Sequence, residues 1–439
     1  MNIARTIIRT LLIWLLIHFV VLTWLEYRIG LTGPLLTVIA LWKEIVVVGR
    51  AARLWTQHHK QIVTLWKSDM VFRIITLVLF GTVAVTIAIG AGGWYSISSY
   101  IAAFKYNLIW FGVGWLAYIS GTMMTRWDSK QINRRYITII KRVLVLSVVR
   151  YAALVVKPWV LKYLWYSKTA YEGTLTAQPP AVYYSEMTSG IQRNQFVFER
   201  PITYWFWLVA FWPIFFVIVL RRKPVSQTWF WWLMYTTAIV LTFSRAARGT
   251  RLLQLAILWY WTYQSSFRKF VDKILLPAII VIVGISYLWF HQIFGGGRQF
   301  SNTWHINALI TSVHAVQEHP LFGWGPGSVG PASHHFWLWY NTENQFLQVL
   351  IEYGLVWFLW WLVLFGGMIA WGVWLRARGG KTDKQSDYLM AYSIGMMWLA
   401  VSWLVLHSRV DRMIVWPVVL LIGMSWGVYV SQQTAKGKS

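Results

Sequence analysis

The chain has 439 residues, of which 57% are hydrophobic and only 12% are charged. A soluble protein of this length carries about twice that share of charged residues. Apolar runs of about 20 residues, the length that spans a bilayer, recur from one end of the chain to the other. We therefore expect an all-α, polytopic membrane protein that forms a single domain over residues 1–439, and we exclude a soluble repeat protein.

The formal net charge is +26, and the chain contains no cysteine. The basic residues lie between the apolar runs and form no separate domain, so we expect no nucleic-acid partner. Anionic membrane lipids and a phosphorylated lipid substrate are the expected partners. Disulfides and thiolate chemistry are excluded. No Walker-type loop and no HExxH pattern occurs, which argues against ATP-driven pumps and common zinc peptidases. We expect no metal and no cofactor.

About twelve spans are predicted from the apolar runs. They cover residues 7–26, 31–49, 71–91, 98–119, 137–156, 202–220, 226–243, 252–266, 274–294, 346–375, 388–407 and 413–430. Most lysines and arginines fall in the short loops of one side, so the positive-inside rule puts both termini in the cytoplasm. The long segments 158–201 and 295–345 are then extracytoplasmic and carry the polar machinery of the active site.

Arginines recur where the predicted spans reach the outer face. Arg200 ends the first long loop, and Arg245, Arg248 and Arg251 follow the span at 226–243 at three-residue spacing. Residues spaced in this way share one face of a helix. Three guanidinium groups close together repel one another unless an anion joins them, and a diphosphate suits their bidentate geometry. The alternative for Arg245 is that it only extends its charge to the membrane surface.

The second long loop contains an arginine, a helix and a turn. Arg298 lies in "GGGRQF", and it is equally well explained as a solvated loop residue. Next, "SNTWHINALITSVHAVQEH" predicts an amphipathic helix that lies flat at the interface over the bundle, with Ser301 as its cap. Its apolar face would consist of Ile306, Leu309, Ile310, Val313 and Val316. "EHPLFGWGPGSVG", residues 318–330, then predicts tight turns and close backbone approach.

The last predicted element of this region begins in "NTENQFLQVLIEYGL", residues 341–355. Two carboxylates accompany the start of an apolar run, although a carboxylate within a membrane helix is costly. Glu343 lies at the helix start, where the helix dipole stabilises its anion. Glu352 lies nine residues further, and we interpret it as a partner of a buried arginine or as part of a broken span. A plain capping role for Glu343 stays open.

The order of these motifs resembles the O-antigen ligase and polymerase superfamily. The resemblance covers residues 200–365 and rests on a Ser-Arg pair after an apolar span, an outer Gly-Arg before a Trp-containing helix, "HPLFGWGPGSVG" and "TENQFLQVLIEYGLVW". It implies a metal-independent glycosyltransferase of GT-C-like architecture. Such enzymes lie in the bacterial inner membrane and move a glycan from undecaprenyl diphosphate to an acceptor hydroxyl on its outer face. The acceptor is lipid A core for the ligases and another lipid-linked repeat unit for the polymerases.

Residue roles follow from this resemblance. The residues expected to bind the diphosphate are Arg245, Arg298, Arg248 and Arg200. In the family, a histidine often stands directly before the asparagine at this helix start. This chain has Glu343 there instead, which favours a polymerase over a ligase. Glu343 could accept the proton of the acceptor hydroxyl, and His334 and His335 stay as alternatives because imidazole titrates near neutrality. The spacing from Arg298 to Trp304 is two residues longer than the family pattern. Other glycan-assembly membrane proteins are expected partners.

Two rival functions belong to other classes. A flippase or exporter of lipid-linked oligosaccharide would carry charges within several spans and related halves. A structural anchor for a synthase complex would leave the outer Arg, His and Glu residues without a role. We therefore expect an inverting glycosyltransferase, with the ligase and the flippase as the alternatives.

Overall fold

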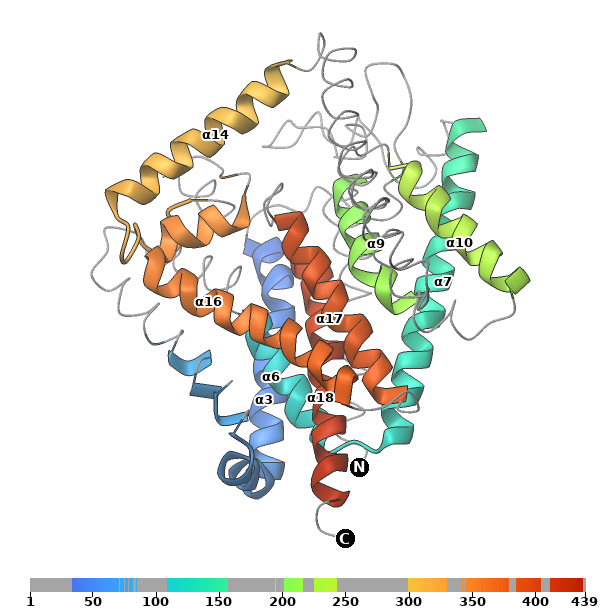
Figure 1. Cartoon of the computed structure of the whole chain (residues 1–439), viewed down its shortest axis with the longest axis vertical. Helices are drawn as coiled ribbons and strands as arrows, with labels where there is room; N and C mark the ends of the chain where they lie inside the picture. Colours follow the sequence, from blue (N-terminus) through green and yellow to red (C-terminus); the bar gives the residue numbers. More distant parts are fainter. Residues whose placement is uncertain are drawn as a thin grey trace, which may run out of the picture.

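A computed structural model describes residues 34–70, 72–74, 76, 77, 79–81, 84, 109–156, 194, 201–215, 225–242, 299–329, 342, 344–378, 384–403 and 411–436. This part of the chain is all-α, as expected, and holds no strand (Figure 1). The helices are α3 (Pro34–Ser68), α6 (Ile109–Thr122), α7 (Arg126–Val156), α9 (Pro201–Phe215), α10 (Val225–Val240), α14 (Gln299–Glu318), α16 (Gln345–Arg378), α17 (Lys384–Trp403) and α18 (Asp411–Lys436).

The closest helix pair joins α6 to α18, far apart in sequence and side by side in the centre of Figure 1. Glycines lie along both sides of this contact. A Cβ atom added to Gly121 would lie 2.3 Å from the carbonyl oxygen of Met424, and one on Gly427 would lie 2.1 Å from that of Tyr118. Gly423, one turn before Gly427, meets the Gly114 carbonyl oxygen in the same way, at 2.4 Å. The two backbones therefore touch directly, and any side chain at these positions would force them apart.

Helices α17, α9 and α7 continue the bundle beside this pair. Gly395 of α17 approaches the backbone of Ala210 in α9, because a Cβ atom on Gly395 would lie 2.4 Å from the Ala210 carbonyl oxygen. Two buried tyrosines add hydrogen bonds between helices. The hydroxyl of Tyr392 donates to the side-chain oxygen of Asn133 in α7, and that of Tyr204 donates to Ser147 at 2.5 Å. These bonds satisfy polar groups that would be costly to bury alone.

Two predicted basic loops are helical, which corrects the sequence-based boundaries. Residues 50–68 were expected to follow a span as a loop, but α3 continues through them to Ser68. Helix α7 begins at Arg126, eleven residues before its predicted span. A capping box starts it: the Asp128 amide donates to Thr125 Oγ1 at 3.2 Å, and the Thr125 amide donates to Asp128 Oδ2 at 3.3 Å. Charged residues lowered the hydropathy of both segments, although α7 continues through its segment and α3 is interrupted only at His58.

Two segments of the described residues are long and apolar enough to cross a membrane, Gln345–Val363 and Val415–Gln432. This criterion uses only length and composition, and the core helix of a soluble protein also meets it. The predicted spans at 226–243, 388–407 and 413–430 coincide with α10, α17 and α18 to within a few residues. The predicted spans at 7–26, 252–266 and 274–294 lie outside the described residues.

Candidate functional site

Helix α16 contains a sharp break at Gly354, where φ is 74° and ψ is −179°. The two parts fold back on each other: the rings of Phe346 and Trp361 lie 5.4 Å apart, whereas fifteen residues of straight helix span about 22 Å. Figure 1 shows this bend on the α14 side of α16. The predicted span at 346–375 is therefore interrupted at Gly354. Length and composition qualify Gln345–Val363 as a candidate span, but the part that ends at Tyr353 is too short to cross a bilayer by itself.

The turn that follows α14 fills the break. The amides of Trp324 and Gly325 donate to the carbonyl oxygens of Ile351 and Glu352, at 2.7 and 3.0 Å. In the opposite direction, the amides of Leu355 and Val356 donate to the oxygens of Pro320 and Leu321, at 2.8 and 3.5 Å. A broken helix loses such bonds on both sides of the break, and buried backbone groups must be paired. The segment 320–325 supplies those partners.

The close approach of these two segments requires glycine at two positions. Gly323 and Gly354 both have positive φ, 70° and 74°. A Cβ atom on Gly354 would lie 2.2 Å from the Leu321 carbonyl oxygen, and one on Gly323 would lie 2.5 Å from that of Ile351. We call this contact between residues 320–325 and 351–356 the junction. It joins two of the four motifs on which the sequence resemblance rests, "HPLFGWGPGSVG" and "TENQFLQVLIEYGLVW".

Helix α14 is attached to the junction through Trp324. The indole Nε1 of Trp324 donates to the Ala315 carbonyl oxygen at 2.9 Å, and Ala315, Val329 and Ile351 form a small buried apolar cluster. The predicted helix is therefore present, but it begins at Gln299, so Ser301 lies inside it and is not its cap. The turn, α14 and the break of α16 form one unit.

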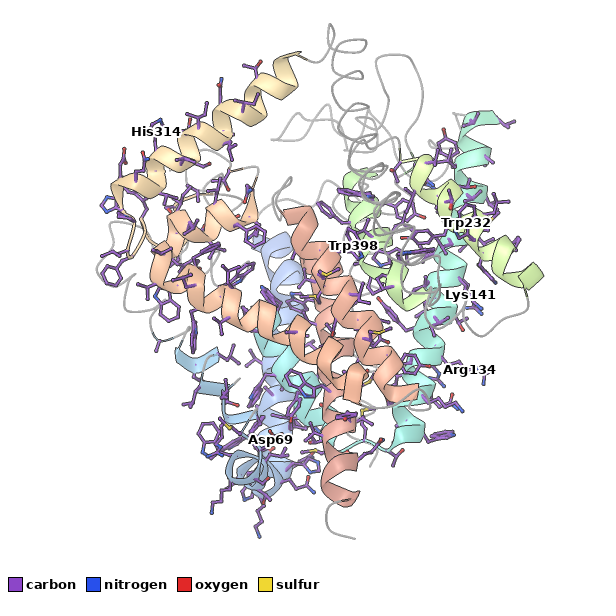
Figure 2. All side chains as sticks on the ribbon, in the orientation of Figure 1. Asp69, Arg134, Lys141, Trp232, His314 and Trp398 are labelled. Carbon is purple, nitrogen blue, oxygen red and sulfur yellow. The ribbon has the colours of Figure 1, made fainter. Side chains whose placement is uncertain are left out.

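Helix α14 presents three different faces. Small residues, Ala308, Ser312 and Ala315, are buried against the rest of the chain. The apolar side chains of Ile306, Leu309, Ile310 and Val313 are exposed, and Val316 is half-buried. The third face is exposed and polar and includes His314, which points away from the bundle in Figure 2.

The short first part of α16 carries a buried polar stripe. Gln345, Gln348 and Glu352 are spaced so that they share one face of the helix, and all three are buried. The Gln348 Nε2 atom donates to Glu352 Oε1 at 3.1 Å. Glu352 thus lies two residues before the break at Gly354, which agrees with one of its two predicted roles, a place at a broken span. Its backbone oxygen is the one that Gly325 binds in the junction.

Asn344 is the cap of this short helix, since its side-chain Oδ1 accepts a hydrogen bond from the Leu347 amide at 3.1 Å. Several oxygen atoms near the junction are buried and make no hydrogen bond within the part of the chain that is described. They are Oε1 of Gln345, Oε1 of Gln348 and Oγ of Ser328. These atoms can accept hydrogen bonds, so a donor such as a hydroxyl group would satisfy them.

The residues expected to perform the chemistry lie outside the described residues. They are Glu343, His334, His335, Arg200, Arg245, Arg248 and Arg298. The structure therefore describes the scaffold beside them, and it adds Gln348 and Gly354, which sequence analysis missed. The spacing of Gln345, Gln348 and Glu352 on one helical face was the available signal for a shared polar stripe. Within the described ranges, no group of three His, Asp or Glu residues could hold a metal ion.

Comparison with models of known protein families, with curated proteins and with solved structures found no match to this chain.

Proposed function

We propose that this chain is a polytopic inner-membrane glycosyltransferase that polymerises glycan linked to undecaprenyl diphosphate. The donor and the acceptor are both lipid-linked repeat units, and the reaction takes place on the outer face. The observation that carries the proposal is the junction. The two motifs that resemble the O-antigen ligase and polymerase superfamily are about 30 residues apart in sequence, and four backbone hydrogen bonds hold them together.

Two features of the fold support a membrane location. Gly423 and Gly427 form a GxxxG pattern at the α6–α18 contact, which is typical of helix pairs in lipid. A broken helix whose freed backbone groups are paired inside the protein is also the form that membrane proteins tolerate at membrane depth. The proposal also includes the other predicted membrane spans and a GT-C-like architecture.

The ends of the bundle agree with the proposed orientation. The basic second part of α3, the start of α7 and the end of α18 lie together at the bottom of Figure 1, and α14 lies at the opposite end. Positive charge concentrates on the cytoplasmic side of membrane proteins. The junction and α14 would then lie toward the outer side, where the lipid-linked glycan is exposed.

In the proposed reaction, the acceptor hydroxyl oxygen attacks the anomeric carbon of the donor sugar from the face opposite the diphosphate. The new glycosidic bond forms as the bond to the diphosphate oxygen breaks, so the configuration inverts. The hydroxyl proton passes to Glu343, or to His334 or His335. Arg245, Arg298, Arg248 and Arg200 stabilise the diphosphate that leaves, so it needs no proton. The junction fixes the helix that follows Glu343.

The ligase alternative uses the same chemistry with lipid A core as the acceptor, whereas the flippase alternative forms no new bond. The test is turnover by the purified chain with a lipid-linked repeat unit as the single substrate, followed as chain growth on a gel. We expect a ladder of products. Transfer to added lipid A core without a ladder would establish the ligase. No product with either acceptor would overturn the glycosyltransferase proposal.

A further inference from the structure

Helix α3 changes direction at His58, where φ is −132° and ψ is 21°. The second part, residues 59–68, is about 15 Å long and cannot cross a hydrocarbon core of about 30 Å. In Figure 1 it is seen nearly end-on, at the end of the bundle where α18 finishes. We call this part the short helix.

The short helix is held in place at both ends. His58 Nδ1 lies 3.0 Å from Gln61 Oε1 at the bend. Beyond its other end, Asp69 accepts hydrogen bonds from the Phe72 amide at 3.1 Å and from the Tyr118 hydroxyl of α6. Asp69 is labelled in Figure 2 beside this end of the bundle. The orientation of the short helix against the bundle is therefore fixed.

The surface of the short helix divides into four stripes. A helix turns by about 100° per residue, so the order of the side chains around the axis follows from the sequence. Ile62 is buried against the bundle, and the next stripe is exposed and largely apolar, with Val63 41% and Trp66 37% accessible. The exposed His59 lies between these two side chains. The third stripe holds Lys60 and Lys67, both exposed. The fourth stripe is polar and uncharged: Gln61, Thr64 and Ser68.

This order matches the depth profile of a membrane surface. Apolar side chains and tryptophan rings enter the boundary between acyl chains and headgroups, lysines reach phosphate groups, and uncharged polar residues face water. Two exposed charged side chains flank the short helix, and both are positive: Arg53 and Arg73. The nearby acid, Asp69, is engaged with Tyr118. A surface with only positive exposed charge beside an apolar stripe complements an anionic lipid surface.

We infer that the short helix, residues 59–68, is a docking site for anionic phospholipid at the cytoplasmic surface of the membrane, with Lys60 and Lys67 binding the phosphate groups. The inference rests on the membrane location in the proposed function but does not depend on glycosyl transfer. Lipid is favoured over a protein partner because the apolar and basic stripes are adjacent and run parallel to the helix axis, so both reach one flat surface.

The test uses the absence of cysteine in this chain. A single Val63→Cys variant is labelled with bimane in detergent micelles and titrated with phosphatidylglycerol or phosphatidylcholine whose acyl chains carry bromine, a contact quencher. We expect half-maximal quenching at a much lower concentration of phosphatidylglycerol. Adding Lys60→Gln and Lys67→Gln should raise that concentration about 25-fold, because each lysine is expected to change the affinity for anionic lipid roughly fivefold. Bimane at Ser68→Cys, which is exposed on the polar stripe, should not be quenched.

The matched control removes two exposed charges elsewhere at the same end of the bundle, Lys130→Gln with Arg134→Gln on α7. We expect this pair to change the half-maximal concentration less than twofold. Equal quenching by phosphatidylglycerol and phosphatidylcholine would overturn the inference. So would a control pair that raises the half-maximal concentration as much as the Lys60 and Lys67 pair does. Protection of the label in a complex of two chains or with a protein, without lipid quenching, would also overturn it. Because no turnover is measured, failure here is distinct from failure of the proposed reaction.

Discussion

Gly354 and Leu321 approach so closely that a Cβ atom on Gly354 would lie 2.2 Å from the Leu321 carbonyl oxygen. This contact, with φ of 74° at Gly354, defines the junction between the turn after α14 and the break of α16. It connects the turn at residues 320–325 to the helix that follows the proposed base. Changes at Gly354 should therefore affect both stability and turnover.

Substitution of Gly354 by alanine should destabilise the chain by about 2 kcal/mol or more. With φ of 74° and ψ of −179°, Gly354 has a conformation that is almost exclusive to glycine and costs an alanine about 1–3 kcal/mol. The Cβ atom must also displace the backbone of Leu321. The midpoint of thermal unfolding of the purified protein measures the loss. Gly366→Ala is the matched control, because a Cβ atom there meets nothing within 4 Å and lies in the same helix. That control should be neutral or slightly stabilising, and a Gly354→Ala protein as stable as the control would contradict the role of the junction.

The contact between Gln348 and Glu352 should also contribute to stability. Gln348→Leu removes the amide that donates to Glu352 Oε1, and loss of a hydrogen bond to a charged group costs about 1.5–3 kcal/mol. The double change Gln348→Leu with Glu352→Leu should lose less than the sum of the two single changes, since no buried carboxylate then remains. Denaturant unfolding of the four proteins in this cycle measures the coupling energy. A coupling energy near zero would show that the pair is not a unit.

Sequence analysis predicted helices well where hydropathy reports them directly, as in α10, α17 and α18. It gave a broken span only as one of two readings of Glu352 and did not place the break at Gly354, because glycine in an apolar run leaves mean hydropathy almost unchanged while the partner segment 320–325 is distant in sequence. It also missed the α6–α18 glycine contact, because hydropathy does not report which helices touch. The helical course of residues 50–68 was missed for the opposite reason: lysines and arginines lower hydropathy but are good helix formers.

Topology can be tested with single cysteines at exposed positions. Ser328 in the turn is a poor choice, since it is only 1% exposed. Gln317→Cys on α14 and Gln61→Cys on the short helix are both exposed. A membrane-impermeant thiol reagent should label Gln317→Cys in intact cells and Gln61→Cys only after the cells are permeabilised. Labelling of Gln61→Cys alone in intact cells would reverse the proposed orientation.

The diphosphate site is tested at Arg245. Arg245→Ala should lower turnover about a hundredfold, because a charge-assisted bond to phosphate contributes about 2–3 kcal/mol. Arg245→Lys should restore activity only in part, since lysine keeps the charge but loses the bidentate fork. Turnover of the lipid-linked repeat unit measures the effect, with membrane insertion checked by expression level. Arg298→Ala should behave in the same way. Wild-type turnover by Arg245→Ala would move the diphosphate site elsewhere.

The identity of the base is tested by Glu343→Gln, which keeps the size of the side chain and removes its charge. If Glu343 accepts the hydroxyl proton, turnover should fall about a hundredfold or more. Binding of the lipid-linked donor should persist, since the arginines carry it. A capping role at Glu343 would predict little loss of rate, and the cap of this helix is already supplied by Asn344.

His334→Ala and His335→Ala decide the alternative. A large loss in one of them, with Glu343→Gln active, assigns the role to imidazole, and the role of Glu343 would then be limited to the start of the helix. Near-normal chain growth in all three variants would mean that none of these side chains is the base. The reaction would then depend on positioning of the hydroxyl against the anomeric carbon, which well-oriented reactants can accelerate by several orders of magnitude. In that case Gly354→Ala, which disturbs the helix after Glu343, should lower turnover more than any of the three.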